Sequence, residues 1–253
     1  MPLHKHDILN LLPLAVGLAL ATTASATDYT FNLAPSDINN GILSAGGTGG
    51  ESIPIGLADS PIGWESGSFV SNIDGAGNRY SQLYVNLPLA LGVSSITLDD
   101  LAGIKYFTKE GTTNALDWAL RIYTKPVAGV TSFYQYRFDS INPAGSNEWS
   151  LWDANTAGWF TNVSDRSNGG NTNTAISQSL SQLTGNYSGD LLYFSLFTGA
   201  SGNTSPLSNG LDGLVVTMAN GDAVRINMVP EPVTASFLVL GSLLLLRRPR
   251  RTC

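Results

Sequence analysis

The chain has 253 residues and a formal net charge of −6, and only 13% of its residues are charged, whereas 27 are glycine and 12 are proline. This length allows one domain of about 200 residues with short terminal segments, and the composition favours an all-β extracellular domain over a cytosolic helical protein. Eight basic and eighteen acidic residues lie between Thr27 and Pro232, a difference of −10, which excludes a basic nucleic-acid-binding surface in this span.

Residues 1–26 have the layout of a secretory signal peptide. A short basic start precedes an apolar run over 8–20, which leads into a stretch of small residues. Ala24 and Ala26 satisfy the small-residue rule for signal peptidase and place the cleavage before Thr27. An uncleaved membrane anchor and a buried core helix are the alternatives, but the run is short for a membrane span, which favours a cleaved signal.

Residues 27–228 are predicted to form a single β-sandwich of jelly-roll or lectin-like type with one short helix. Short segments with period-two alternation and turn residues between them carry this prediction. The expected strands in chain order are 104–109, 116–123, 133–138, the apolar central strand 191–197, and the hairpin strands 214–218 and 223–228.

Turn and helix signals complete the predicted domain. Asn220 and Gly221 tolerate positive φ and suit the tight turn of the last hairpin. The helix is expected over 176–183, with Gly185 ending it. Stretches rich in glycine, serine and asparagine predict loops at 44–52, 161–174 and 199–210.

The C-terminal segment 229–253 has three parts in a fixed order: Pro230, Glu231 and Pro232, then an uncharged apolar helix over 233–246, then a basic end over 247–251. The basic cluster predicts that the helix inserts into a membrane with its end in the cytoplasm and the domain outside. The prolines mark the start of the helix, since they cannot lie in its interior. The four basic residues are Arg247, Arg248, Arg250 and Arg251.

This arrangement resembles the PEP-CTERM sorting signal of exported bacterial proteins. The resemblance covers about the last 25 residues and implies recognition by the membrane transpeptidase exosortase, with Pro230, Glu231 and Pro232 as the recognition residues. It also implies transient insertion in the inner membrane, followed by release to the cell surface or the medium. An ordinary C-terminal membrane anchor is the alternative.

Histidine and cysteine occur only in the two terminal segments, as His4, His6 and Cys253. With both segments removed, the domain can form no disulfide, no Ser-His-Asp or Cys-His nucleophile, and no imidazole or thiolate zinc site. Glycoside hydrolysis needs only two carboxylates at a suitable separation. The available acids, which show no spacing that places two on one face, are Glu65, Glu110, Glu148 and Asp153.

No metal or cofactor site is expected. The segment 74–78 has some oxygen ligands of a calcium loop but lacks its alternating acids, so a plain turn is favoured. Asp99 and Asp100 either serve calcium or cap the turn before Leu101. The glycine run 46–50 lacks the lysine that a phosphate-binding loop requires.

Three tryptophans close in sequence, Trp149, Trp152 and Trp159, are the candidate glycan-binding residues. Aromatic rings beside amides and carboxylates commonly hold sugars, although rings in a sandwich more often belong to its core. The sequence therefore predicts a non-catalytic exported surface or matrix protein. A carbohydrate-binding module is the first alternative, and a glycosidase or polysaccharide lyase is the second.

Overall fold

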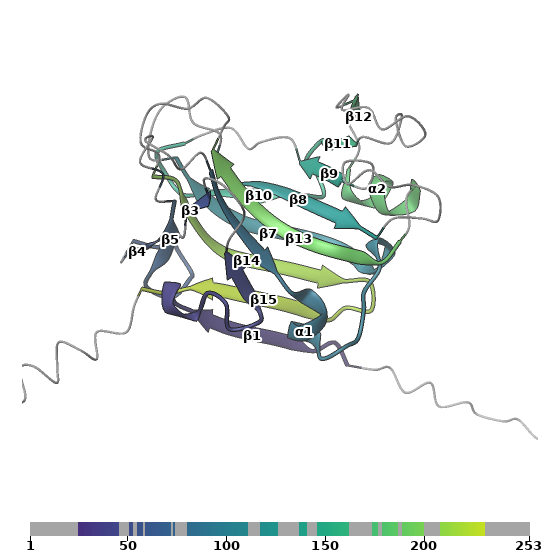
Figure 1. Ribbon diagram of the computed structural model, residues 1–253, viewed down its shortest axis with the longest axis horizontal. Helices are drawn as coiled ribbons and strands as arrows, with labels where there is room; N and C mark the ends of the chain where they lie inside the picture. Colours follow the sequence, from purple (N-terminus) through teal and green to yellow (C-terminus); the bar gives the residue numbers. More distant parts are fainter. Residues whose placement is uncertain are drawn as a thin grey trace, which may run out of the picture.

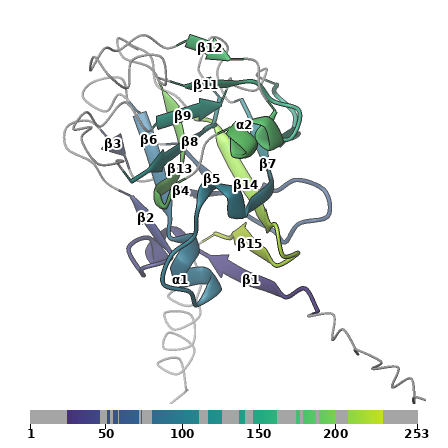
Figure 2. The ribbon, with the colours of Figure 1, turned by 90° about the vertical axis from the view of Figure 1, so that its right-hand side faces the viewer.

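The computed structural model describes residues 25–45, 51–52, 55–57, 59–71, 73, 80–110, 117–125, 137–140, 146–161, 174–176, 179–186, 189–199 and 208–230. In this part the chain is mostly β and forms two sheets that pack face to face as a sandwich (Figures 1 and 2). The helices among these residues are short. None of them is long and apolar enough to cross a membrane.

Sheet A has seven strands and sheet B has eight. The strands of sheet A are β1 (Asp28–Leu33), β4 (Ile55–Leu57), β5 (Ser68–Val70), β7 (Leu101–Lys109), β10 (Ser150–Asp153), β14 (Gly210–Met218) and β15 (Ala223–Met228). The strands of sheet B are β2 (Leu43–Ala45), β3 (Glu51–Ser52), β6 (Tyr80–Val85), β8 (Ala119–Thr124), β9 (Arg137–Ser140), β11 (Trp159–Thr161), β12 (Thr174–Ile176) and β13 (Leu191–Gly199).

Strand β14 is the centre of sheet A. It pairs antiparallel with β7 along one edge, while β15 and the shorter β5 share the other edge. Strand β1 lies parallel to β15, with Asp28 opposite Ala223 and Leu33 opposite Met228, and the two arrows run the same way in Figure 1. The first and last strands of the domain are therefore direct neighbours.

Sheet B is antiparallel around its central strand β13, which pairs with β6 on one side and β8 on the other. Beyond β8 the order continues through β9 and β11 to β12, and beyond β6 lies β2. Side chains alternate across these strands because successive residues of a strand point to opposite faces. Leu83, Leu120 and Leu196 thus point into the core, whereas Gln82, Arg121 and Ser195 lie on the outer face.

The core between the two sheets is aromatic and aliphatic. Its largest fully buried side chains include Trp118, Trp159, Tyr106, Phe69 and Phe138. Two of its large buried side chains use their polar atoms in hydrogen bonds to backbone carbonyls, as buried polar groups usually do. The Trp118 indole donates to the Asn209 carbonyl at 2.8 Å, and the Tyr106 hydroxyl donates to the Trp118 carbonyl at 2.8 Å.

The last predicted hairpin is confirmed: β14 and β15 pair antiparallel, and Gly221 has φ of 94° in the turn between them. The strands expected at 104–109 and 116–123 correspond to β7 and β8, although they belong to different sheets. Only 137–138 of the strand expected at 133–138 is described, as the start of β9.

The helix prediction is wrong in its bounds and in its number. Helix α2 covers Leu180–Asn186, and Ile176 belongs to β12 instead. The Ser179 backbone N–H donates to the Gln182 side chain at 3.0 Å, a capping interaction that starts the helix later than the apolar spacing indicated. A second helix, α1 (Leu87–Leu91), follows Asn86, and two 3-10 turns cover Pro35–Asp37 and Leu98–Asp100.

Two further predictions need correction. The loop expected at 44–52 includes the end of β2 and all of β3. Strand β13 is central, but it is not covered on both faces throughout. Its beginning, at Leu192 and Tyr193, is 42% and 43% exposed.

Candidate functional site

Two of the three candidate glycan-binding tryptophans are core residues. Trp159 is fully buried and Trp152 is 7% exposed. Their ring centroids lie 6.4 Å apart, and Trp152 also packs against Tyr106 at 4.8 Å. Since β10 and β11 belong to opposite sheets, this contact joins the two layers. The glycan-binding prediction is therefore wrong for Trp152 and Trp159, because buried rings cannot stack on a sugar.

Trp149 is half-buried and packs against the backbone of β14. A Cβ atom added at Gly210 would lie 2.8 Å from its ring. The indole N–H donates to the Asp59 carboxylate at 3.2 Å, and Lys109 forms an ion pair with the same carboxylate at 2.7 Å. This ion pair and hydrogen bond lower the pKa of Asp59. Trp149 thus attaches the segment containing Asp59 to sheet A.

Two of the four candidate carboxylates, Asp153 and Glu65, have structural partners on different strands. Asp153 forms an ion pair with Lys105 at 3.0 Å, and Glu65 accepts a hydrogen bond from the Asn32 amide at 3.0 Å. Asp100 caps the 3-10 turn, accepting from the Thr97 backbone N–H at 2.7 Å, as the capping alternative predicted. Among the described residues no group of three or more metal-binding side chains gathers. The segments 46–50 and 74–78 lie outside those residues.

A groove of about 560 Å³ lies on the outer face of sheet B. It lies where β2, β6, β8 and β13 meet the start of α1. We call it the tyrosine groove. Its lining residues are Gly41, Ser44, Tyr84, Val85, Asn86, Leu87, Pro88, Ile96, Tyr123, Leu191, Leu192, Tyr193 and Phe194.

Three tyrosine rings from three neighbouring strands form the wall of this groove. Tyr193 packs edge-on against Tyr84 at 5.6 Å and against Tyr123 at 5.9 Å between ring centroids. The pairing of β8 with β13 shifts between Leu191 and Tyr193, and such an irregularity re-aims the side chains at it. Tyr123 is buried to 5% exposure, which raises the pKa of its hydroxyl, whereas Tyr193 stands open to solvent.

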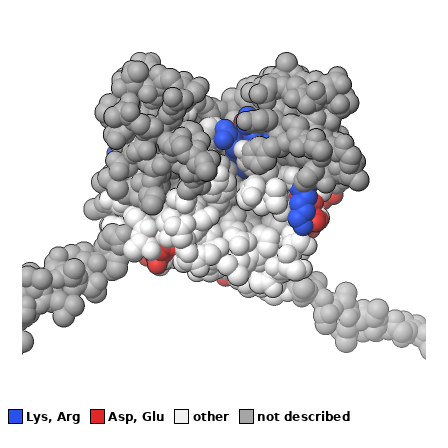
Figure 3. All heavy atoms as spheres, in the orientation of Figure 1, with Lys and Arg blue, Asp and Glu red and all other residues white. Residues whose placement is uncertain are grey.

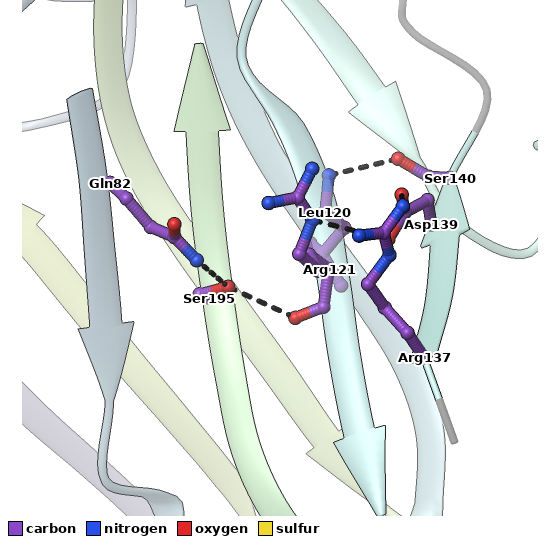
Figure 4. A network of polar contacts seen from close by, with 7 residues as sticks. All are labelled: Gln82, Leu120, Arg121, Arg137, Asp139, Ser140 and Ser195. Atoms are coloured by element: carbon purple, nitrogen blue, oxygen red, sulfur yellow. Dashed lines mark hydrogen bonds and ion pairs between the residues drawn. The ribbon is translucent and has the colours of Figure 1, made fainter. Parts of the chain in front are cut away.

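A polar network lies on the same face of sheet B (Figure 4), and its Ser195 is the strand partner of Tyr84. The Gln82 amide donates to the Ser195 hydroxyl at 2.9 Å, and that hydroxyl donates to the Arg121 carbonyl at 3.2 Å. Asp139 forms ion pairs with Arg121 at 3.2 Å and with Arg137 at 2.9 Å. The Arg121 guanidinium also lies over the Phe197 ring, 3.8 Å from its centroid. These contacts join β6, β13, β8 and β9 and fix the outer face.

The rim of the tyrosine groove is apolar and uncharged. Leu89 of α1 is exposed and lies close to Gly41 of the lining, and Leu192 stands exposed beside Tyr193. No lysine, arginine, aspartate or glutamate is among the described residues that line the groove. The described surface around α1 carries few charges in Figure 3. An exposed apolar rim around polar hydroxyls is suited to an uncharged, amphipathic ligand.

Sequence reasoning missed these tyrosines because no local motif contains them. Tyr84, Tyr123 and Tyr193 come from three strands separated by long stretches of chain, and only the pairing of β6, β13 and β8 brings them together. The exposed aromatic position at Tyr193 was also hidden inside a run that is apolar almost throughout.

The residues of the two processing signals lie partly outside the described chain. Ala24 and residues 231–253 are not described. Ala26 and Thr27 lie just before β1, and Pro230 packs against Gly67, which has φ of 124°. Comparison with family models, with curated proteins and with solved structures finds no match to this chain.

Proposed function

We propose that this chain is an exported, non-catalytic surface protein whose domain binds a neutral polysaccharide in the tyrosine groove. The observation that carries the proposal is the edge-on contact of Tyr193 with Tyr84 and Tyr123 in an uncharged cavity of about 560 Å³. This volume lies within the range of about 300–1,000 Å³ that small-ligand sites occupy. The sequence offered carbohydrate binding only as an alternative, on the tryptophans; the proposal here places it on the tyrosines instead.

The chemistry of the groove is suited to sugars. Aromatic faces contact the C–H groups of a pyranose ring, and hydroxyl and amide groups exchange hydrogen bonds with sugar hydroxyls. Tyr193 offers the exposed ring, and Ser44 and Asn86 supply polar groups at the lining. We accordingly assign the sandwich to the lectin-like or jelly-roll type.

The export proposal rests on the two terminal segments. Signal peptidase would cut after Ala26, so that the chain would begin at Thr27, whose backbone is hydrogen-bonded to Asp222 and Ala223. Exosortase would act at Pro230, Glu231 and Pro232, two residues beyond the end of β15 at Met228. The domain would pass through an inner-membrane intermediate to the cell surface or the extracellular matrix. The net negative charge of the domain argues against a nucleic-acid partner, because it would repel phosphate groups.

The non-catalytic part of the proposal rests on the sequence of the processed domain, which has neither histidine nor cysteine. Burial raises the pKa of Asp117 to about 6 and that of Asp212 to about 7. Neither residue lines the tyrosine groove. A glycosidase or lyase would need such a group beside the bound sugar. Incubation with laminarin, mannan and alginate that yields no new reducing ends or unsaturated uronides would support this part.

The binding proposal is tested by retention of the purified protein on laminarin, mannan and alginate gels. We expect retention on a neutral gel, loss of at least tenfold in affinity in Tyr193→Ala, and little change in Trp149→Ala, whose ring lies on sheet A. Circular dichroism shows that each variant is folded. Equal retention of Tyr193→Ala and the unaltered protein would reject the groove, and loss in Trp149→Ala alone would restore the tryptophan site.

The export proposal has its own test. Mass spectrometry of the protein from fractionated host cells identifies its two terminal residues. A first residue of Thr27 and a last residue near Pro232 are expected. Recovery of Cys253 in the membrane fraction would show instead a permanently anchored protein.

A further inference from the structure

Thr27 is hydrogen-bonded through both of its backbone groups to the turn between β14 and β15. Its N–H donates to the Asp222 carboxylate at 2.8 Å, and its carbonyl accepts from the Ala223 N–H at 2.9 Å. The second oxygen of Asp222 accepts from the Asn220 side chain at 2.9 Å. The atom that signal peptidase would release therefore already points at a carboxylate.

We propose that cleavage before Thr27 creates an ammonium group that binds Asp222, so that processing adds an ion pair between the start of β1 and the β14–β15 turn. This inference rests on the export proposal. In the uncleaved chain the Thr27 nitrogen belongs to a neutral amide. Hydrolysis adds water across the Ala26–Thr27 bond, leaving a carboxylate on Ala26 and an amine on Thr27 that takes up a proton.

The chemistry favours the protonated amine. An unperturbed α-amine has a pKa of about 7.7–8.0, so a large fraction is charged at neutral pH. The bond from the Thr27 amide to the Asp222 carboxylate already has a charged acceptor, and the ammonium adds the attraction between opposite charges. The ammonium also has three donors where the amide had one, and one of them keeps the Asp222 contact.

The charges around Thr27 are mostly negative. Asp28 of β1 forms an ion pair at 3.1 Å with Arg225 of β15, two positions along from its register partner Ala223. Asp100 shares a cavity of about 290 Å³ with Asp222 and Tyr29. Three carboxylates and one guanidinium thus lie around the start of β1 and the β14–β15 turn, and this excess of negative charge stabilises the charged form of the amine.

Cleavage also removes a close contact. A Cβ atom added at Gly221 would lie 3.2 Å from the Cβ of Ala26, so the last leader residue packs against the turn. At its other end β1 is held by the Val229 N–H, which donates to the Leu33 carbonyl at 2.9 Å. When the leader is removed, the new ion pair strengthens the attachment of β1 to β15 at the Thr27 end, while the Val229 hydrogen bond holds the Leu33 end.

The test compares the chain 27–253, released from a cleavable tag in detergent, with the same chain extended to begin at Ser25. The pH dependence of acetylation of the terminal amine, read by mass spectrometry of the first peptide, gives its pKa. We expect the pKa at Thr27 to exceed that at Ser25 by about half a unit or more. Asp222→Asn should abolish the difference, and Glu148→Gln, which changes an exposed acid beside β10 on the far side of sheet A, should preserve it.

Each outcome decides between the proposals. An unchanged amine pKa in Asp222→Asn overturns the ion pair, and the export proposal stands if the host protein begins at Thr27. A host protein that keeps residues 1–26 overturns the export proposal, and with it the role of cleavage in forming the pair.

Discussion

The carboxylate of Asp212 accepts a hydrogen bond from the Met228 backbone N–H at 2.8 Å, which joins β14 to the last residue of β15. The other carboxylate oxygen has no hydrogen-bond partner within the part of the chain that the structure describes. Burial of this group raises its pKa from 3.8 to about 7. A charged carboxylate here is poorly compensated, since one oxygen lacks a donor.

This relationship predicts an unusual pH dependence of stability. A raised pKa means that the folded state binds the proton more tightly, so the contribution of Asp212 is complete below pH 3.8 and is lost as the pH rises to about 7. Asp117, with a pKa of about 6, acts in the same direction. We expect the free energy of unfolding by urea to increase as the pH falls from 8 to 5.

Asp212→Asn isolates the first group, because the amide oxygen can still accept from Met228. We expect the variant to be more stable than the unaltered protein by about 1–3 kcal/mol at pH 8, with a much weaker pH dependence. Urea unfolding at pH 5 and pH 8 measures both quantities. A variant that is equally pH-dependent would contradict a raised pKa at Asp212.

The close packing around Gly213 predicts that a side chain at this position lowers stability. The glycine has φ of 63°, and an added Cβ would lie 2.7 Å from the Trp64 ring. Gly213→Ala should cost about 1–3 kcal/mol more than Gly92→Ala, whose φ of 69° is similar but which has no atom within 4 Å of the added Cβ. Chemical denaturation of the two variants separates the steric cost from the conformational one. Equal costs would show that Trp64 moves aside freely.

The Asp139 ion pairs predict a third effect. The Asp139 side chain is 15% exposed and faces two arginines, whereas Asp190 is 45% exposed and pairs with Lys125. Asp139→Asn should lower the free energy of unfolding by about 2 kcal/mol, because two guanidinium groups lose a charged partner. Asp190→Asn should cost less than about 1 kcal/mol. The reverse order would show that the network of Figure 4 does not stabilise sheet B.

The uncharged lining of the tyrosine groove predicts that binding of a neutral polysaccharide is insensitive to salt. Ions screen contacts between charges, and none of the described residues in the groove is charged. Affinity for laminarin or mannan, measured by calorimetry, should change less than about twofold between roughly 0.1 and 1 M salt. A steep decrease would indicate that charged groups outside the groove contact the ligand.

The β architecture and the last hairpin were predictable because they depend on local signals. The turn forms at Asn220 and Gly221, whose residue types favour it. The alternation of apolar and polar residues also predicted the buried faces of β7 and β8, which include Tyr106 and Leu120. The start of α2 also has a local cause, the capping contact between Ser179 and Gln182. The prediction placed the start too early because it relied on the apolar spacing and not on this cap.

The candidate site was not predictable in the same way. Whether a tryptophan lies inside or outside depends on which sheet its strand joins, and the partner of Trp152 across the sandwich is Trp159 on the other sheet. The nearness of the three tryptophans in sequence therefore did not predict which of them would be exposed. Tyr84, Tyr123 and Tyr193 become neighbours only through strand pairings made over long chain separations.

The parallel pairing of β1 with β15 has a consequence for how the domain is made. Asp28 and Ala223 are neighbours in the sheet although nearly the whole domain lies between them in the chain. Strand β1 is made first but cannot pair until β15 has been made, and pairing over such a long chain separation is slow. A chain threading through a translocation channel in N-to-C direction would thus stay incomplete, and transport-competent, until its final strand has crossed.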